Sequence, residues 1–217
     1  MERILRGEPG WQEAVRDALA RAPRPLDVPQ NVRAADGATS LDRFDRSRMP
    51  PAREASTLLL LYPDAHGELT VPVTVRRPDL RAHAGEVSLP GGSVDPGDAS
   101  REAAALREAH EEIGVAPELV SILGALDDIW IPVSNFELRP FVGATDARPR
   151  MVPQDREVAA IVELPLRLLL SGEIGGEEEI EVRGMRLRGA VYRHAGQRIW
   201  GATQRTLAML VAALTAE

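Results

Sequence analysis

The feature that most limits the possible folds is one strong helix placed among strand patterns. Residues 100–113 are rich in alanine, glutamate and leucine, and Gly114 stands where a helix commonly ends in the left-handed conformation. Upstream, residues 55–62 read as a buried strand and residues 69–76 contain many β-branched side chains. Turn chemistry separates these two segments, which predicts a hairpin before the helix.

The rest of the chain adds strands and helices in an irregular order. Sequence patterns predict strands at 119–126, 138–143 and 158–164, a short helix at 165–170, a hairpin over 180–192 that turns near Gly184, and a closing helix at 203–214. This order lacks the regular alternation of a doubly wound sheet. We therefore expect an α/β fold with a mixed β-sheet between helices.

The N-terminal quarter differs from the remainder. Residues 11–21 predict an amphipathic helix, because a tryptophan, a valine and a leucine recur every four positions. Residues 22–52 are rich in proline, arginine and aspartate and show little periodicity. We predict that residues 1–52 form a helix and an extended appendage that wraps the core, and that residues 53–217 form the main domain.

The charge and the missing residue types restrict the chemistry. The chain has 26 basic and 33 acidic residues and a formal net charge of −7, which argues against a general nucleic-acid or anionic-membrane binder. The basic residues are all arginine, so lysine Schiff bases and a Walker-type lysine are excluded. The chain has no cysteine, which excludes disulfides, thiolate nucleophiles and cysteine-ligated zinc. An anionic small-molecule substrate remains compatible, because local arginines or a bound metal can meet it.

The location is expected to be cytoplasmic. Residues 1–6 are charged, and the glycines and proline that follow do not form the apolar stretch of a signal peptide. The longest apolar run, near residues 58–62, is far shorter than the roughly 20 residues that a membrane-spanning helix needs. The oligomeric state stays open, and a homodimer is compatible with the sequence.

Three glutamates of the predicted helix form a candidate metal site. At about 100° per residue, Glu108, Glu111 and Glu112 cluster on the face opposite an apolar stripe centred on Leu106. Arg107 precedes Glu111 by four residues and can pair with it. A solvated helix face is the plain alternative for such a pattern on its own.

The residues before the helix favour the metal site. Gly91 and Gly92 predict a tight backbone turn beside the helix, and Asp95 and Asp98 lie between the turn and the helix. Hard divalent cations prefer oxygen ligands and retain waters for a phosphate substrate. The sequence therefore predicts Mg²⁺ or Mn²⁺ as the cofactor.

This stretch resembles the Nudix box. Gly92 is followed after five residues by Asp98 and then by Arg107-Glu108-Ala109-His110-Glu111-Glu112-Ile113-Gly114-Val115. The resemblance implies a Nudix-type α/β/α sandwich and hydrolysis of a nucleoside diphosphate linked to another moiety. It also implies that the three glutamates hold Mg²⁺ or Mn²⁺ and that Arg107 orients them. An aspartate stands at position 98 where the general motif has glutamate, with one extra residue before Arg107.

Those departures resemble the coenzyme A diphosphatase branch of the family. The spacing of that branch's preceding signature is kept by Arg76, Arg81, Gly85 and the Pro90-Gly91-Gly92 turn. Arg77 replaces a small residue of the signature, and Leu89 replaces phenylalanine. The resemblance implies cleavage of coenzyme A (CoA) or acyl-CoA to 3′,5′-ADP and (acyl-)phosphopantetheine. It also implies that Arg76 and Arg81 hold phosphates and that Gly91 and Gly92 let the backbone approach the diphosphate.

Several alternatives stay open. Arg76 and Arg81 are, on composition alone, equally well explained as surface arginines. Glu157 opens a predicted strand and suits a further metal ligand or base outside the box, and Glu86 is a similar candidate. The substrate could instead be ADP-ribose or NADH, against which the signature argues. A catalytically idle nucleotide-binding protein is the third possibility, against which the intact glutamates argue.

Overall fold

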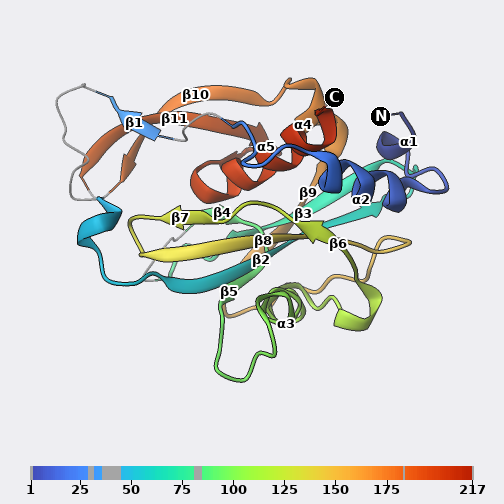
Figure 1. Ribbon diagram of the computed structural model, residues 1–217, viewed down its shortest axis with the longest axis horizontal. Helices are drawn as coiled ribbons and strands as arrows, with labels where there is room; N and C mark the ends of the chain where they lie inside the picture. Colours follow the sequence, from blue (N-terminus) through green and yellow to red (C-terminus); the bar gives the residue numbers. More distant parts are fainter. Residues whose placement is uncertain (1, 29–31, 36–44, 81–84, 183, 217) are drawn as a thin grey trace.

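The computed structural model describes residues 2–28, 32–35, 45–80, 85–182 and 184–216. At its centre lies a mixed sheet of eight strands (Figure 1). These strands are β2 (Arg53–Pro63), β3 (Leu69–Arg76), β4 (Val87–Ser88), β5 (Gly91–Ser93), β6 (Ser121–Ala125), β7 (Ile129–Ile131), β8 (Phe136–Ala144) and β9 (Val158–Pro165). Their main order is β4-β3-β2-β8-β6, while β5 pairs with β2, β7 with β8, and β9 with β3.

The central strand β2 pairs in parallel with β8, from Arg53 opposite Phe136 to Leu61 opposite Ala144. The other pairings of this sheet are antiparallel. Residues 58–62 of β2 are fully buried, as expected for a strand that is covered on both faces. The chain between β2 and β8 contains the helix α3 (Arg101–Ile113), so the glutamates lie within the connection between two parallel strands.

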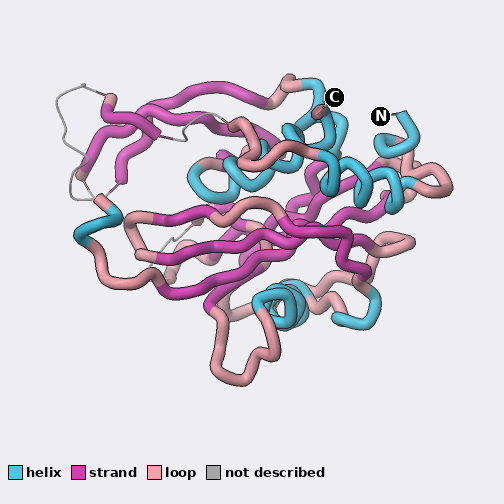
Figure 2. The backbone as a smooth tube through the Cα atoms, in the orientation of Figure 1, coloured by secondary structure: helices cyan, strands magenta, loops and turns pink. Residues whose placement is uncertain are grey.

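Helices cover both faces of the sheet (Figure 2). α3 packs on one face, against the side chains of Leu58, Leu60 and Tyr62. The other face is covered by α2 (Trp11–Arg21) and α5 (Gly201–Thr215), with α1 (Glu2–Leu5) and α4 (Leu166–Ser171) beside them. The expected α/β/α sandwich around a mixed sheet is therefore confirmed.

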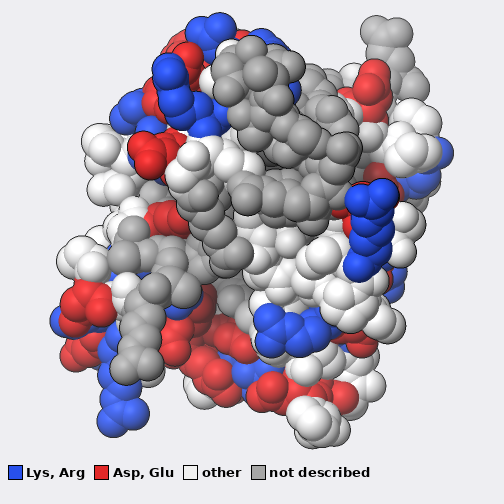
Figure 3. Space-filling view, turned by 90° about the vertical axis from the view of Figure 1, so that its left-hand side faces the viewer, with Lys and Arg blue, Asp and Glu red and all other residues white. Residues whose placement is uncertain are grey.

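A second, four-stranded antiparallel sheet lies beside α5 and was not predicted. It consists of β1 (Val32–Ala34), β10 (Gly175–Val182), β11 (Met185–His194) and β12 (Gln197–Ile199). The predicted hairpin is present as β10 and β11, and Gly184 at its turn has φ of +73°. Figure 3 shows acidic and basic side chains intermixed over this upper part of the molecule.

The ends of α3 are defined by local chemistry; Gly114 ends it as predicted, while Ser100, which was expected to be its first residue, caps it instead. The Ser100 hydroxyl oxygen accepts a hydrogen bond of 3.0 Å from the amide of Ala103, which caps the first turn. Gly114 ends the helix with φ of +72°. The predicted helix over 11–21 is also present, as α2.

The N-terminal residues make several contacts with the rest of the molecule. Trp11, Val15 and Leu19 of α2 are buried in the same core cluster as α5, and β1 pairs with β11. The division of the chain between residues 52 and 53 stays a prediction. In the described part of the chain, no helix combines the length and the apolar character needed to cross a bilayer.

Candidate active site

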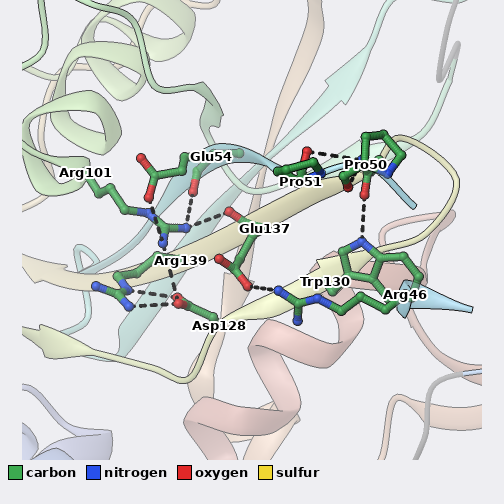
Figure 4. Close-up of polar contacts among 11 residues, drawn as sticks. Arg46, Pro50, Pro51, Glu54, Arg101, Asp128, Trp130, Glu137 and Arg139 are labelled. Carbon is green, nitrogen blue, oxygen red and sulfur yellow. Dashed lines mark hydrogen bonds and ion pairs between the residues drawn. The ribbon is translucent and has the colours of Figure 1, made fainter. Parts of the chain in front are cut away.

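The start of α3 is anchored to both parallel strands through Arg101. Its Nη2 atom donates hydrogen bonds to the carbonyl oxygens of Ala55, at 2.9 Å, and Glu137, at 2.6 Å. Its Nη1 atom lies 3.7 Å from Glu54 and 3.5 Å from Asp128 (Figure 4). This anchor fixes the helix that carries the glutamates against the starts of β2 and β8. This role of Arg101 was not predicted from the sequence. The one sequence signal for it is the position of a basic residue in the first turn, where its charge opposes the helix dipole.

The glycine turn forms a short strand rather than the predicted loop. Gly91 and Gly92 in β5 pair with Thr57 and Ser56 of β2. A Cβ atom built on Gly92 would lie 2.4 Å from Oε1 of Glu108, and one built on Gly91 would lie 2.4 Å from the Ser56 carbonyl oxygen. The absence of side chains therefore lets the α3 carboxylates approach the β5 backbone.

Glu112 is the most buried of the three glutamates, with 6% of its surface exposed. Its Oε2 atom accepts a hydrogen bond of 3.3 Å from the Gly91 amide, and its Oε1 atom lies 3.9 Å from Nη1 of Arg76. Burial, followed by the nearby charge of Glu108, raises the pKa of Glu112 from 4.5 to about 7, although the Gly91 amide and Arg76 act in the opposite direction. A buried carboxylate with this pKa would be stabilised in its charged form by a cation.

The expected arrangement of the helix faces was partly wrong. Glu112 shares the buried side with Ala105, Ala109 and Ile113, while Leu106, the expected centre of the apolar stripe, is only partly buried. Glu112 is accommodated there because β5 offers a backbone amide and no side chain.

Acidic side chains gather at the lower edge of the molecule in Figure 3, at the level of α3.

Arg107 connects two of the glutamates to the loop before the helix. Its Nη1 atom donates to Glu108 Oε1 at 3.0 Å and to Glu111 Oε2 at 3.1 Å, so the predicted pair with Glu111 is present. Its Nε and Nη2 atoms form a fork with both carboxylate oxygens of Asp98, each at 3.0 Å. Nη2 also donates to the Ser93 carbonyl oxygen at 3.0 Å. The fork lowers the pKa of Asp98, while burial raises the pKa of Glu108.

Arg76 joins the same group from the end of β3. A β-bulge between Val75 and Arg76 interrupts the pairing with β9, and such bulges re-aim side chains. The Arg76 guanidinium lies between Glu112 and Glu157, with Nη2 3.7 Å from Glu157 Oε2. The Glu86 carbonyl oxygen accepts a hydrogen bond from the Arg76 amide. Arg81 lies outside the described residues.

Glu157 reaches the site on a loop that rests against the end of α3. The amide of Val152 donates to the Ile113 carbonyl oxygen, and the amide of Gln154 donates to the Glu112 carbonyl oxygen, both at 2.9 Å. The structure thus brings Glu157 close to the box glutamates, although no sequence pattern indicates this loop contact. This loop contact could not be predicted from the sequence, because the backbone amide of any residue type can make these hydrogen bonds.

The side-chain atoms of the three glutamates are of the chemical type that binds a hard divalent cation. Glu108, Glu111 and Glu112 offer only carboxylate oxygens, and Glu112 is buried with its pKa raised. Within the described ranges, no three acidic or histidine side chains converge closely enough to hold a metal ion in this arrangement. Arg107 takes up one oxygen of Glu108 and one of Glu111, so these side chains would have to rotate to bring their other oxygens together around a cation.

Comparison with known proteins relates this chain to the Nudix hydrolases. The NUDIX domain family model matches residues 44–181. The uncharacterized Nudix hydrolase NudL of Pectobacterium atrosepticum is 37% identical over 151 residues, which covers 70% of this chain and 77% of that protein. NudL of an Enterobacter species is 38% identical over 131 residues, or 60% of this chain and 68% of that protein.

Solved structures give a weaker likeness. The crystal structure of the Nudix hydrolase RenU from M. smegmatis aligns with a TM-score of 0.47 and 22% identity, over 66% of this chain and 84% of that one. A NUDIX hydrolase from Alicyclobacillus acidocaldarius aligns with a TM-score of 0.48 and 21% identity, over 77% and 95% of the two chains. Since the family model covers more than half of the sequence, the chain belongs to the Nudix hydrolase family, whose substrates are nucleoside diphosphate derivatives.

Proposed function

We propose that the protein hydrolyses the diphosphate bond of CoA or acyl-CoA, releasing 3′,5′-ADP and (acyl-)phosphopantetheine. The observation that carries the hydrolytic part is the burial of Glu112 against the Gly91 amide, beside Glu108 and next to Arg76. A buried, acid-rich group with an adjacent arginine suits a diphosphate bound together with a divalent cation. The choice of CoA is supported by the signature spacing from Arg76 to Gly92.

Glu108, Glu111 and Glu112 would hold Mg²⁺ or Mn²⁺. When bound, the cation would lower the pKa of a coordinated water and neutralise charge on the diphosphate. Arg107 keeps Glu108 and Glu111 oriented through its two hydrogen bonds. The Gly91-Gly92 turn would let the backbone approach the diphosphate, as the resemblance implies.

The remaining chain residues would act on the substrate and on protons. Arg76 donates to a phosphate oxygen, and its place between Glu112 and Glu157 favours the diphosphate over a more distant phosphate. That leaves the 3′-phosphate, the group that distinguishes CoA from dephospho-CoA, to Arg81. Glu157 lies at the open side of the group, with half of its side chain exposed, and would accept a proton at a carboxylate oxygen from the attacking water.

Product analysis tests the proposal directly. The purified protein is incubated with CoA and Mn²⁺, and the products are identified by mass spectrometry, with ADP-ribose and NADH in parallel reactions. The proposal expects 3′,5′-ADP and phosphopantetheine from CoA, and no products from the Glu112→Gln variant. Turnover of ADP-ribose or NADH without turnover of CoA would overturn the choice of substrate. Nucleotide binding without turnover of any of the three would instead favour an idle binding protein.

A further inference from the structure

Arg77 is the residue that departs from the small side chain expected in the signature, and its contacts are well defined. Its Nε and Nη2 atoms donate to the two carboxylate oxygens of Asp79, at 2.8 and 2.9 Å. Its Nη1 atom donates to the carbonyl oxygen of Asp155 at 3.0 Å. The fork with Asp79 fixes the plane of the guanidinium and leaves Nη1 pointing at the loop before β9. These bonds occupy all three nitrogens of the Arg77 guanidinium.

The contacted loop is the one that carries Glu157. The Arg77 amide donates to the Glu157 carbonyl oxygen at 2.9 Å, and the Gln154 amide donates to the Glu112 carbonyl oxygen at 2.9 Å. Residues 154–157 are therefore held at one end by the last turn of α3 and at the other end by Arg77. The Asp155 bond adds a side-chain clamp to the backbone contact, two residues before Glu157.

The Glu157 side chain itself has little to fix it. Its side chain is 51% exposed, and its ion pair with Arg76, at 3.7 Å, is shared with Glu112. An exposed ion pair of this length contributes little to holding a side chain in place. The position of Glu157 relative to the box glutamates therefore depends on where the backbone of residues 154–157 is held.

We propose that Arg77 is a positioning residue, which holds Glu157 beside Glu112 by clamping the Asp155 carbonyl oxygen. This inference rests on the proposed function, in which Glu157 takes part in the reaction. In this proposal Arg77 binds the loop that carries Glu157 and does not contact the substrate's phosphates. The clamp belongs to this chain, since a small side chain at position 77 has no group that could reach Asp155.

A double-mutant cycle tests the clamp. Arg77→Ala removes the fork and keeps the backbone bond to Glu157, so the fold should survive, as an unchanged Tm would verify. We expect kcat on CoA with Mn²⁺ to fall about tenfold, with KM changed by less than about twofold. In the Glu157→Gln background, the same substitution should cause no further loss, because the group that it positions is already gone. Asp79→Asn should lower kcat in the same direction by a smaller factor.

A second readout is independent of turnover. Hydrogen exchange followed by mass spectrometry should show faster exchange over residues 152–158 in Arg77→Ala, because the clamp on that loop is lost. Arg156→Ala is the matched control, since Arg156 is exposed on the same loop and the substitution removes the same charge. It should leave both kcat and the exchange rates at the parent values.

Three results would overturn the proposal. An equal loss of kcat from Arg77→Ala in the parent and Glu157→Gln backgrounds would show that Arg77 does not act through Glu157. A rise in KM with unchanged kcat would place Arg77 on the substrate. A parent-like kcat in Glu157→Gln alone would remove the reason for the clamp, while the box glutamates, tested separately by Glu112→Gln, would keep their proposed role.

Discussion

Gly92 lies so close to the Glu108 carboxylate that a Cβ atom added to the glycine would lie 2.4 Å from Oε1 and 2.7 Å from Cδ. Gly91, its neighbour in β5, faces backbone instead, because its added Cβ would lie 2.4 Å from the Ser56 carbonyl oxygen and 2.7 Å from the Thr57 Cα atom. The two adjacent glycines therefore serve different purposes, one for the candidate site and one for the sheet.

Alanine at these two positions should separate activity from stability. Gly92→Ala displaces the end of a flexible side chain, so we expect kcat to fall at least about tenfold with little change in Tm. Gly91→Ala forces the β2 backbone to move and should cost about 1–3 kcal/mol of unfolding free energy. Thermal unfolding and steady-state kinetics of both variants provide the check. Equal effects of the two substitutions on Tm would contradict this assignment.

Stability without metal should depend on pH through Glu112. The pKa of this carboxyl is about 7 in the folded protein and 4.5 in its ordinary state, so the folded protein binds more protons between these values. The contribution of Glu112 to stability is therefore largest below about pH 4.5 and is lost as pH rises to about 7, by up to about 3 kcal/mol. Urea unfolding in EDTA should show this loss in the parent relative to Glu112→Gln. If the difference in unfolding free energy between the two proteins stays constant with pH, the pKa of Glu112 is not raised in the folded protein.

Glu111 allows a test of metal binding that leaves the core intact. Its side chain is 56% exposed, so Glu111→Gln should keep the parent Tm in EDTA. We expect its kcat to fall at least about a hundredfold, because one ligand of the cation is lost. Parent protein at Mn²⁺ about 100 times above Kd should gain about 2.7 kcal/mol of stability, and the variant should gain clearly less. Glu118→Gln, an exposed change outside the box, should behave like the parent.

Arg76 and Arg81 should differ in their effect on substrate choice. Because Arg76 lies beside Glu112, Arg76→Ala should lower kcat/KM for CoA and dephospho-CoA equally. The loss should be roughly tenfold to a hundredfold, which corresponds to about 1.5–3 kcal/mol for a charged hydrogen bond. Arg81→Ala should penalise CoA more than dephospho-CoA. If both variants match the parent kinetics on both substrates, Arg76 and Arg81 are surface residues without a role in substrate binding. ADP-ribose would then be the better supported substrate.

The parts of the fold that depend on local chemistry could be predicted from the sequence. Ser100 and Gly114 define the ends of α3 through bonds and dihedral angles of their own segment. β2 was predictable because a strand covered on both faces has a continuous apolar run. The short strands were missed, since the pairing of Val32 with Gly189, for example, joins residues that are far apart in the chain.

The candidate site shows the same limit. The spacing of the glutamates and glycines predicted which side chains would gather, but the helical period alone did not predict which side of α3 faces the sheet. Glu112 is buried because the Gly91 amide is there to meet it, and that pairing depends on the register of β5 with β2. The contact of Arg77 with the Asp155 carbonyl oxygen has no sequence pattern, and that of Arg101 has only the indirect one of a basic residue in a first helix turn.

Because β2 pairs in parallel with β8, the chain between them must cross from the end of one strand back to the start of the other. That connection contains the glycine turn and α3, so the carboxylates reach their final positions only when this long loop closes. Closing a long loop costs chain entropy before the new strand contacts repay it, which makes such steps slow. We therefore expect assembly of the site to be tied to a late step of folding. A chain refolding from denaturant should regain turnover together with the β2–β8 pairing and not with the earlier formation of its helices.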